Sequence, residues 1–95
     1  MRNVRKVSKP DLDVHKEYSA KIGESSYSFR YELTEDAFLN QLYIITLRSK
    51  KNEIFQYYSQ SKPTLDNKNM ICIPEEMQGF APKNAKSVTI VLESK

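Results

Sequence analysis

The first ten residues hold the densest cluster of positive charge in the chain. Four cations lie here without an acidic residue: Arg2, Arg5, Lys6 and Lys9. The 95-residue chain has a formal net charge of only +3, so the remaining residues carry a net −1 and cannot attract a polyanion over a broad face. Because guanidinium and ammonium groups pair with phosphates and carboxylates, residues 1–10 are predicted to be a basic arm, or a basic first strand, that contacts a partner.

A second set of candidate contact residues lies in the middle of the chain. Three cations are predicted at one hairpin tip: Arg48, Lys50 and Lys51. If the arm and this tip converge, they form a patch that binds phosphate groups. Tyr57 and Tyr58 must point to opposite faces of a strand. At least one of them is therefore predicted on an outer or rim face, where tyrosine contacts proteins or stacks on bases.

Residue types that carry catalysis are scarce. The single histidine, His15, is predicted on the polar face of a strand, and the single cysteine, Cys72, lies in the apolar run "MICI". Nucleophilic catalysis needs a nucleophile beside a base, whereas this pattern indicates a solvated histidine and a small buried cysteine. Asp11 and Asp13 are too few for a metal site, and two glycines cannot form a phosphate-binding loop. No catalytic residue, metal, cofactor or small-molecule substrate is predicted, so the chain is not expected to be an enzyme.

The elements that position these residues are predicted from period-two alternation of apolar and polar side chains. Six strands are predicted: 11–22, 27–33, 42–49, 54–60, 70–74 and 87–94. The first two form a hairpin around the turn "GESS". The strand at 42–49 is apolar on both faces, which predicts cover on each side. One or two helical turns are predicted at 34–41, where Thr34 can cap a helix, and a further turn at 75–78.

The strand pattern predicts one all-β domain. Residues 11–95 are expected to form an antiparallel β-sandwich of six to seven strands, the seventh coming from residues 2–7. The strand number fits an immunoglobulin-like sandwich, although the core tryptophan and the cysteine pair typical of that fold are missing. A small barrel of the OB or SH3 type is the alternative. On the last strand, Val88, Ile90 and Leu92 are predicted to point inward.

The expected function is that of a non-catalytic protein-interaction or assembly module, such as a small structural or accessory protein of a phage or mobile element. A protein partner or a second copy of the chain is the favoured partner. The alternative is a nucleic-acid-binding domain that uses the basic arm and the 48–51 hairpin tip. No signal peptide or transmembrane segment is seen in the sequence, so a cytoplasmic or virion-associated location, without membrane contact, is expected.

Overall fold

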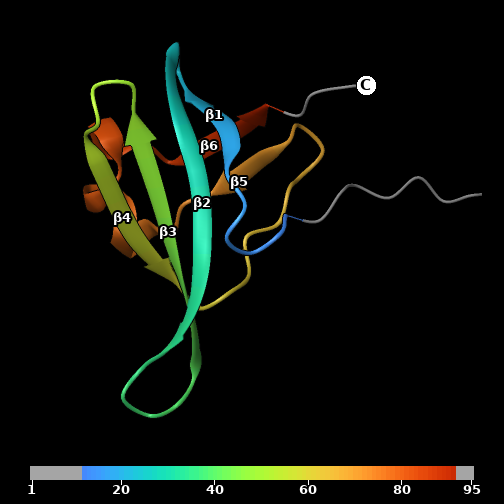
Figure 1. Cartoon of the computed structure of the whole chain (residues 1–95), viewed down its shortest axis with the longest axis vertical. Helices are drawn as coiled ribbons and strands as arrows, with labels where there is room; N and C mark the ends of the chain where they lie inside the picture. The colour runs from blue at the N-terminus through green and yellow to red at the C-terminus, as the bar shows by residue number, and fades with distance from the viewer. Residues whose placement is uncertain (1–11, 92–95) are drawn as a thin grey trace, which may run out of the picture.

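The structure, a computed structural model, describes residues 12–91 (Figure 1). These residues form six strands and two short 3-10 helices. Their bounds are β1 Tyr18–Ile22, β2 Ser25–Glu35, β3 Gln41–Ser49, β4 Ile54–Ser59, β5 Met70–Cys72, η1 Glu75–Phe80, η2 Pro82–Asn84 and β6 Ser87–Val91. The predicted all-β, antiparallel fold class is confirmed. The strand predicted at 2–7 lies outside the described residues.

All six strands belong to one sheet in the order β4-β3-β2-β1-β6-β5, and every pair of neighbours is antiparallel. A sandwich requires two stacked sheets, so the predicted sandwich is not confirmed. The single sheet is coiled, and β5 and β6 run obliquely behind β1 and β2 in Figure 1. As a result, the two edge strands, β4 and β5, line the same pocket. They do not pair with each other, so the sheet stays open along this seam between β4 and β5.

The inner face of the coiled sheet carries the hydrophobic core, because every second side chain of each strand points toward it. The buried apolar residues are Leu12, Ala20, Phe29, Tyr31, Ile45, Leu47, Tyr57, Ile71, Ile73, Ala81, Val88 and Ile90. On β6, Val88 and Ile90 are buried while Val91 is exposed, which confirms the predicted inward side of this strand. Leu92, predicted to point inward as well, lies outside the described residues.

The first strand is shorter than the alternation at 11–22 predicted. β1 begins at Tyr18, and the backbone before it turns at His15, which has a φ of 69°. Val14 and Lys16, which an uninterrupted strand at 11–22 would place on the same side as Leu12, are exposed. Only Leu12 reaches the core from this segment, and the Tyr31 hydroxyl donates a hydrogen bond to its carbonyl oxygen at 2.7 Å.

The helical turn predicted at 34–41 is wrong. Thr34 and Glu35 continue β2, and Gln41 already belongs to β3, so residues 36–40 form a tight hairpin loop. The acidic start of this segment resembles a helix N-terminus in sequence, because a carboxylate that accepts backbone N–H groups closes a hairpin loop as readily as it caps a helix. The helical turn predicted at 75–78 is present, as part of η1.

The strand at 42–49 is covered less completely than its composition predicted. β3 lies next to the edge strand β4, and its inner side chains Ile45 and Leu47 are buried. On the outer face Ile44 and Thr46 are only half-buried. The outer face of the sheet is therefore accessible to solvent.

Candidate functional site

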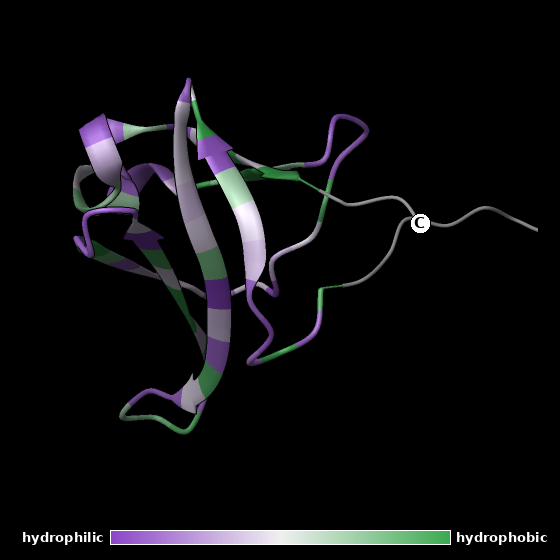
Figure 2. Ribbon diagram, turned by 45° about the horizontal axis from the view of Figure 1, so that its top comes forward, coloured by the Kyte–Doolittle hydropathy of each residue, from purple (hydrophilic) through white to green (hydrophobic). Residues whose placement is uncertain are grey.

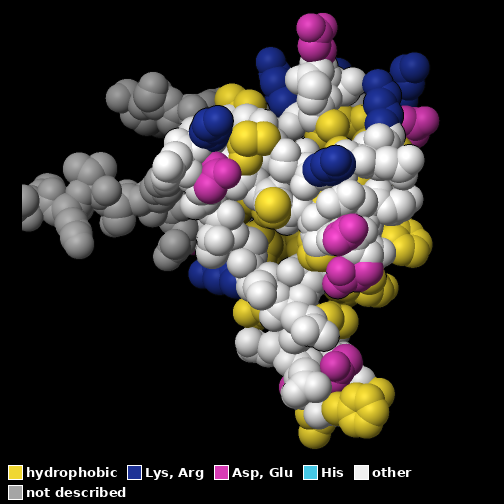
Figure 3. All heavy atoms as spheres, turned by 180° about the vertical axis from the view of Figure 1, so that it is seen from behind, with side chains coloured by type: hydrophobic (Ala, Val, Ile, Leu, Met, Phe, Trp, Pro, Cys, Tyr) yellow, Lys and Arg dark blue, Asp and Glu magenta, His cyan; other side chains and the backbone are white. Residues whose placement is uncertain are grey.

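The β2–β3 hairpin projects from the body of the molecule and ends in exposed apolar side chains. Phe38 is 83% exposed and Leu39 is 75% exposed. Figure 2 shows that the loop at the end of this hairpin is hydrophobic over much of its length, and Figure 3 shows hydrophobic side chains gathered there. Exposed apolar side chains are common singly, whereas two adjacent large ones at the end of a projection are a candidate contact surface. We call residues 36–40 the apolar tip.

Asp36 closes the apolar tip. One of its carboxylate oxygens accepts hydrogen bonds from the backbone N–H of Phe38 at 2.8 Å and of Asn40 at 3.0 Å. Backbone bonds from Asp36 N–H to the Asn40 carbonyl and from Leu39 N–H to the Asp36 carbonyl, each 3.0 Å long, complete the closure. The N–H groups of Asn40 and Phe38 together hold the pKa of Asp36 below its ordinary value. The two apolar side chains thus stand on a loop with a defined backbone.

The same closure recurs in two other loops, residues 49–53 between β3 and β4 and residues 66–70 before β5. In each loop, the side chain of the first residue accepts hydrogen bonds from the backbone N–H groups two and four residues later. That first residue is Ser49 in one loop and Asp66 in the other. The backbone bonds of the apolar tip are repeated at the same positions. The three loops are therefore one structural motif with different sequences.

The three loops differ at their fourth residue, which has a left-handed backbone in each. The φ angles are 65° at Leu39, 68° at Asn52 and 61° at Asn69. Asparagine tolerates this conformation, whereas a bulky side chain there costs about 1–2 kcal/mol. Leu39 is thus an apolar, strained and solvent-exposed residue at a position that asparagine fills in the other two loops. Strain retained at an exposed position points to a function for that side chain.

The hairpin that bears the apolar tip is acidic. Asp36 lies in the tip and Glu35 next to it, whereas Glu32 is ion-paired with Arg30 at 2.7 Å, and the sequence contains no lysine or arginine between Arg30 and Arg48. Figure 3 shows acidic side chains beside the hydrophobic end of the hairpin. Such a surface is repelled by an anionic bilayer and complements an apolar pocket with a cationic rim.

The predicted cationic residues are only partly placed. Arg2, Arg5, Lys6 and Lys9 lie outside the described residues. Arg48, Lys50 and Lys51 are exposed at the end of β3 opposite to the apolar tip. Arg48 and Lys50 line a shallow hollow on the outer face of the sheet together with Lys21, whereas Lys51 is not part of its lining. The structure therefore brings two of the predicted cations together with a third, Lys21, that the sequence analysis did not single out.

The two predicted contact tyrosines have different environments. Tyr57 is only 2% exposed and belongs to the core, so its prediction as a surface contact is wrong. Tyr58 is 47% exposed on the outer side of β4. This agrees with the prediction that at least one of the two neighbouring tyrosines lies on an outer face. A contact role for Tyr58 stays a prediction.

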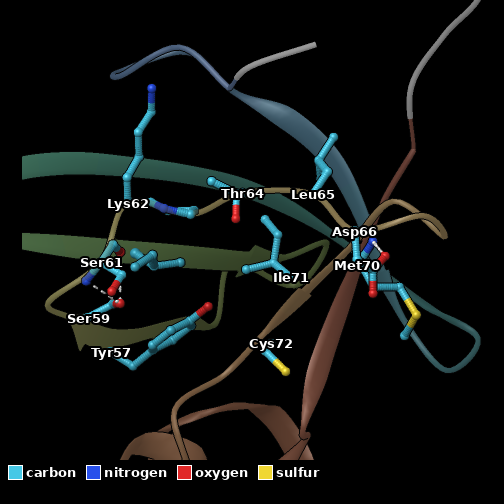
Figure 4. Close-up of a pocket in the computed structure, with 12 residues that line it drawn as sticks. Tyr57, Ser59, Ser61, Lys62, Thr64, Leu65, Asp66, Met70, Ile71 and Cys72 are labelled. Atoms are coloured by element: carbon cyan, nitrogen blue, oxygen red, sulfur yellow. Dashed lines mark hydrogen bonds between the residues drawn. The ribbon is translucent and has the colours of Figure 1, made fainter. Parts of the chain in front are cut away.

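A pocket of about 330 Å³ lies in the seam between β4 and β5 (Figure 4). Its lining includes Tyr57 of β4 and Cys72 of β5, but not His15. Cys72 is exposed, which corrects the prediction of a buried cysteine. The Tyr57 hydroxyl is buried and has no hydrogen-bond partner within residues 12–91. Its burial, and to a lesser extent the charge of Cys72, raises the pKa of Tyr57. The pocket therefore does not bring Cys72 together with His15, the single histidine of the chain.

Comparison with models of protein families, with curated proteins and with solved structures gave no match to this chain. Within the part of the chain that the structure describes, no group of three or more histidine, cysteine, aspartate or glutamate side chains could hold a metal ion. None of the helices between residues 12 and 91 has the length and apolar character to cross a bilayer.

The apolar tip was not predicted from the sequence. Phe38 and Leu39 were expected in the helical turn at 34–41, where apolar residues would face the core. The signal that could have found the tip is the similarity of the segments Asp36–Asn40, 49–53 and 66–70, each with a side-chain acceptor first. The latter two carry asparagine in the fourth position, typical of a left-handed turn residue. Recognition of that pattern would have marked Leu39 as anomalous.

Proposed function

We propose that this chain is a protein-interaction module that inserts the apolar tip of its β2–β3 hairpin into a pocket on a partner protein. The observation that carries the proposal is the pair Phe38 and Leu39, exposed side by side on a closed loop. Because hydrogen bonds to Asp36 already fix the backbone, little conformational entropy is lost when the two side chains are buried. The strained conformation of Leu39 is explained if its side chain is needed for contact.

The contribution of the tip alone is limited. Burial of two large apolar side chains supplies about 3–6 kcal/mol before the costs of association are subtracted. A stable complex with a micromolar dissociation constant requires a net of about 8 kcal/mol. The partner therefore has to cover neighbouring parts of the hairpin as well. Leu33, which is 47% exposed on β2 near the tip, is the nearest further apolar contact.

The charge of the hairpin narrows the class of partner. The carboxylates of Glu35 and Asp36, at the tip, favour lysine and arginine around the entrance of the partner's pocket and slow the approach of acidic surfaces. The partner is thus a protein with an apolar pocket and a basic rim. A second copy of the chain and a different protein both fit this description, and an assembly role in a phage or mobile element is compatible with either.

The experiment replaces Phe38 by a photo-crosslinking phenylalanine analogue and identifies what becomes attached to it in the source cells. A matched control carries the analogue at Lys51, the equivalent third residue of the loop with the same closure at the opposite end of β3. The proposal predicts one dominant crosslinked protein at position 38 that is absent at position 51. Its binding to the purified chain should be lost with Phe38→Ser but not with Lys51→Ser. Identical or random crosslinking at both positions would contradict the proposal.

A further inference from the structure

A shallow hollow on the outer face of the sheet combines three cations with small hydroxyl side chains. It has a volume of about 450 Å³ and lies over β1, β2, β3 and the end of β6. Lys21 stands on one side, and Arg48 and Lys50 stand on the other. Between them lie three serines, whose short side chains leave the outer face recessed: Ser19, Ser26 and Ser28. Val91 completes the outer-face rim.

The strand register explains why these residues meet. Ser19 on β1 faces Ser28 on β2, and Ser28 faces Arg48 on β3, so the three form one row across the sheet. Lys21 faces Ser26 in the neighbouring row. Alternation places all of these side chains on the face opposite to the core. The hollow is therefore set by backbone pairing over three strands rather than by the position of one mobile side chain.

The charge around the hollow is uncompensated. No residue that lines it is acidic. Within residues 12–91 the sheet has one ion pair, between Arg30 and Glu32, and it does not involve these cations. Strands lie about 4.8 Å apart, so Lys21 and Arg48, two strands from each other, can both extend their long side chains over one bound group. Ammonium, guanidinium and hydroxyl groups around a recess are suited to the oxygens of a phosphate.

We infer that this hollow, which we call the serine hollow, binds a phosphate group held by Lys21, Arg48 and Lys50, with serine hydroxyls donating to its oxygens. The phosphate can belong to a free inorganic or nucleotide phosphate or to the backbone of a single-stranded nucleic acid, since both present the same oxyanion. The serine hollow is independent of the apolar tip, which lies at the opposite end of β3. Failure of one proposal therefore leaves the other untouched.

The test titrates the isotope-labelled full chain with pyrophosphate and, separately, with an oligothymidylate, at low and at moderate salt. The expected result is a shift of the backbone amide signals of Ser19, Lys21, Ser26 and Ser28 with at least one probe. Shifts with both probes assign the hollow to free phosphates as well as nucleic acid, and shifts with the oligonucleotide alone assign it to a nucleic-acid backbone. No shift with either probe at low salt overturns the inference.

Single substitutions distinguish phosphate binding in the serine hollow from nonspecific electrostatic attraction of the anion to the surface. Lys21→Gln and Arg48→Gln should each weaken binding about fivefold and lower the salt slope for the oligonucleotide by about 0.7. The control is Lys51→Gln, which removes the same charge from the same end of β3 but lies outside the lining and should change binding less than about twofold. Ser28→Val fills the recess without altering charge and should also abolish the shifts. Equal loss with Lys51→Gln, or full binding by Ser28→Val, overturns the proposed site.

Discussion

Tyr31 and Leu12 are joined across the molecule: the Tyr31 hydroxyl donates to the Leu12 carbonyl oxygen at 2.7 Å, although the two residues are nineteen positions apart. The Tyr31 backbone carbonyl also accepts a hydrogen bond from His15 N–H at 3.0 Å. One residue of β2 therefore holds both ends of the turn that precedes β1. This turn contributes Leu12 to the core, so the bond couples a surface segment to the packing of the interior.

We expect Tyr31→Phe to lower the free energy of unfolding by about 1–3 kcal/mol, because it leaves a buried carbonyl without its donor. Chemical denaturation measures the change. Tyr43→Phe is the matched control, since the Tyr43 hydroxyl makes only a long, exposed bond of 3.4 Å to Gln41. If both variants lose the same stability, the bond to Leu12 is not the cause.

Leu39→Asn should raise the free energy of unfolding by about 1 kcal/mol, because asparagine adopts the left-handed backbone with less strain than leucine. The same substitution should weaken binding to the partner proposed above. If Leu39→Asn raises the free energy of unfolding and weakens binding, the Leu39 side chain is needed for binding and not for folding. Asn52→Leu in the equivalent loop should have the opposite effect on stability, and a gain of stability there would contradict the explanation by strain.

The apolar tip should loosen in acid. Hydrogen bonds from Asn40 and Phe38 lower the pKa of Asp36 below its ordinary value of 3.8, so the charged carboxylate favours the closed loop. This contribution is complete above pH 3.8 and is lost as the pH falls further through the lowered pKa. The protection of the Phe38 and Asn40 amides, measured as their exchange rate relative to the intrinsic rate at each pH, should therefore fall only below pH 3.8. Asp36→Asn should remove this pH dependence, and a transition centred above pH 3.8 would contradict the assignment.

Alkaline pH should destabilise the fold through Tyr57. Burial raises the pKa of its hydroxyl above the ordinary value of 10.0, so the unfolded chain loses this proton at a lower pH than the folded chain does. The contribution of the protonated Tyr57 hydroxyl to the free energy of unfolding is therefore fully present below pH 10 and is lost as the pH rises further. Tyr57→Phe should reduce this fall and, because the hydroxyl has no partner within residues 12–91, should leave stability at neutral pH unchanged or raise it by about 1 kcal/mol. The exposed Tyr58→Phe is the control, and a large loss of stability at neutral pH in Tyr57→Phe would show that the hydroxyl is bonded.

The two faces of β6 should respond differently to the same charge. Ile90→Asp places an unpaired carboxylate in the core and should cost several kcal/mol, about the whole stability of a domain of this size. Thr89→Asp should change stability by less than about 1 kcal/mol, because Thr89 lies on the outer face opposite Lys21, which can pair with the new charge. Thermal unfolding of both variants measures the difference. Equal effects would contradict the assignment of inner and outer sides.

The sequence predicted the strands well where alternation was uninterrupted and buried. Val88 and Ile90 on β6 and Phe29 and Tyr31 on β2 lie on the inner side because burial enforces period two. Residues 12–17 alternate as clearly but do not form a strand, since no neighbouring strand pairs with them and His15 turns the backbone. Alternation reports which side chains could share a face, and pairing decides whether they do.

The candidate sites were harder to predict, because each depends on a relationship between residues far apart in the sequence that is visible only in the folded structure. Leu39 is anomalous only when its loop is seen to match those of Asn52 and Asn69. Lys21 belongs to the serine hollow only through the register that brings β1, β2 and β3 together. Tyr57 and Tyr58 were predicted to differ in exposure, but the sequence did not say which of them lies inside.

Because the three loops share the same closing hydrogen bonds, the three central residues of one loop could replace those of another. In the 36–40 and 49–53 loops, the outer residues fix the register of the two strands that each loop joins, so the central tripeptide can be grafted or diversified without rebuilding the scaffold. Replacement of Lys50, Lys51 and Asn52 by Ala-Phe-Leu would place a second recognition element at the other end of β3. Such a chain would be bivalent, and its avidity for a clustered target would rise without any change in the individual contact.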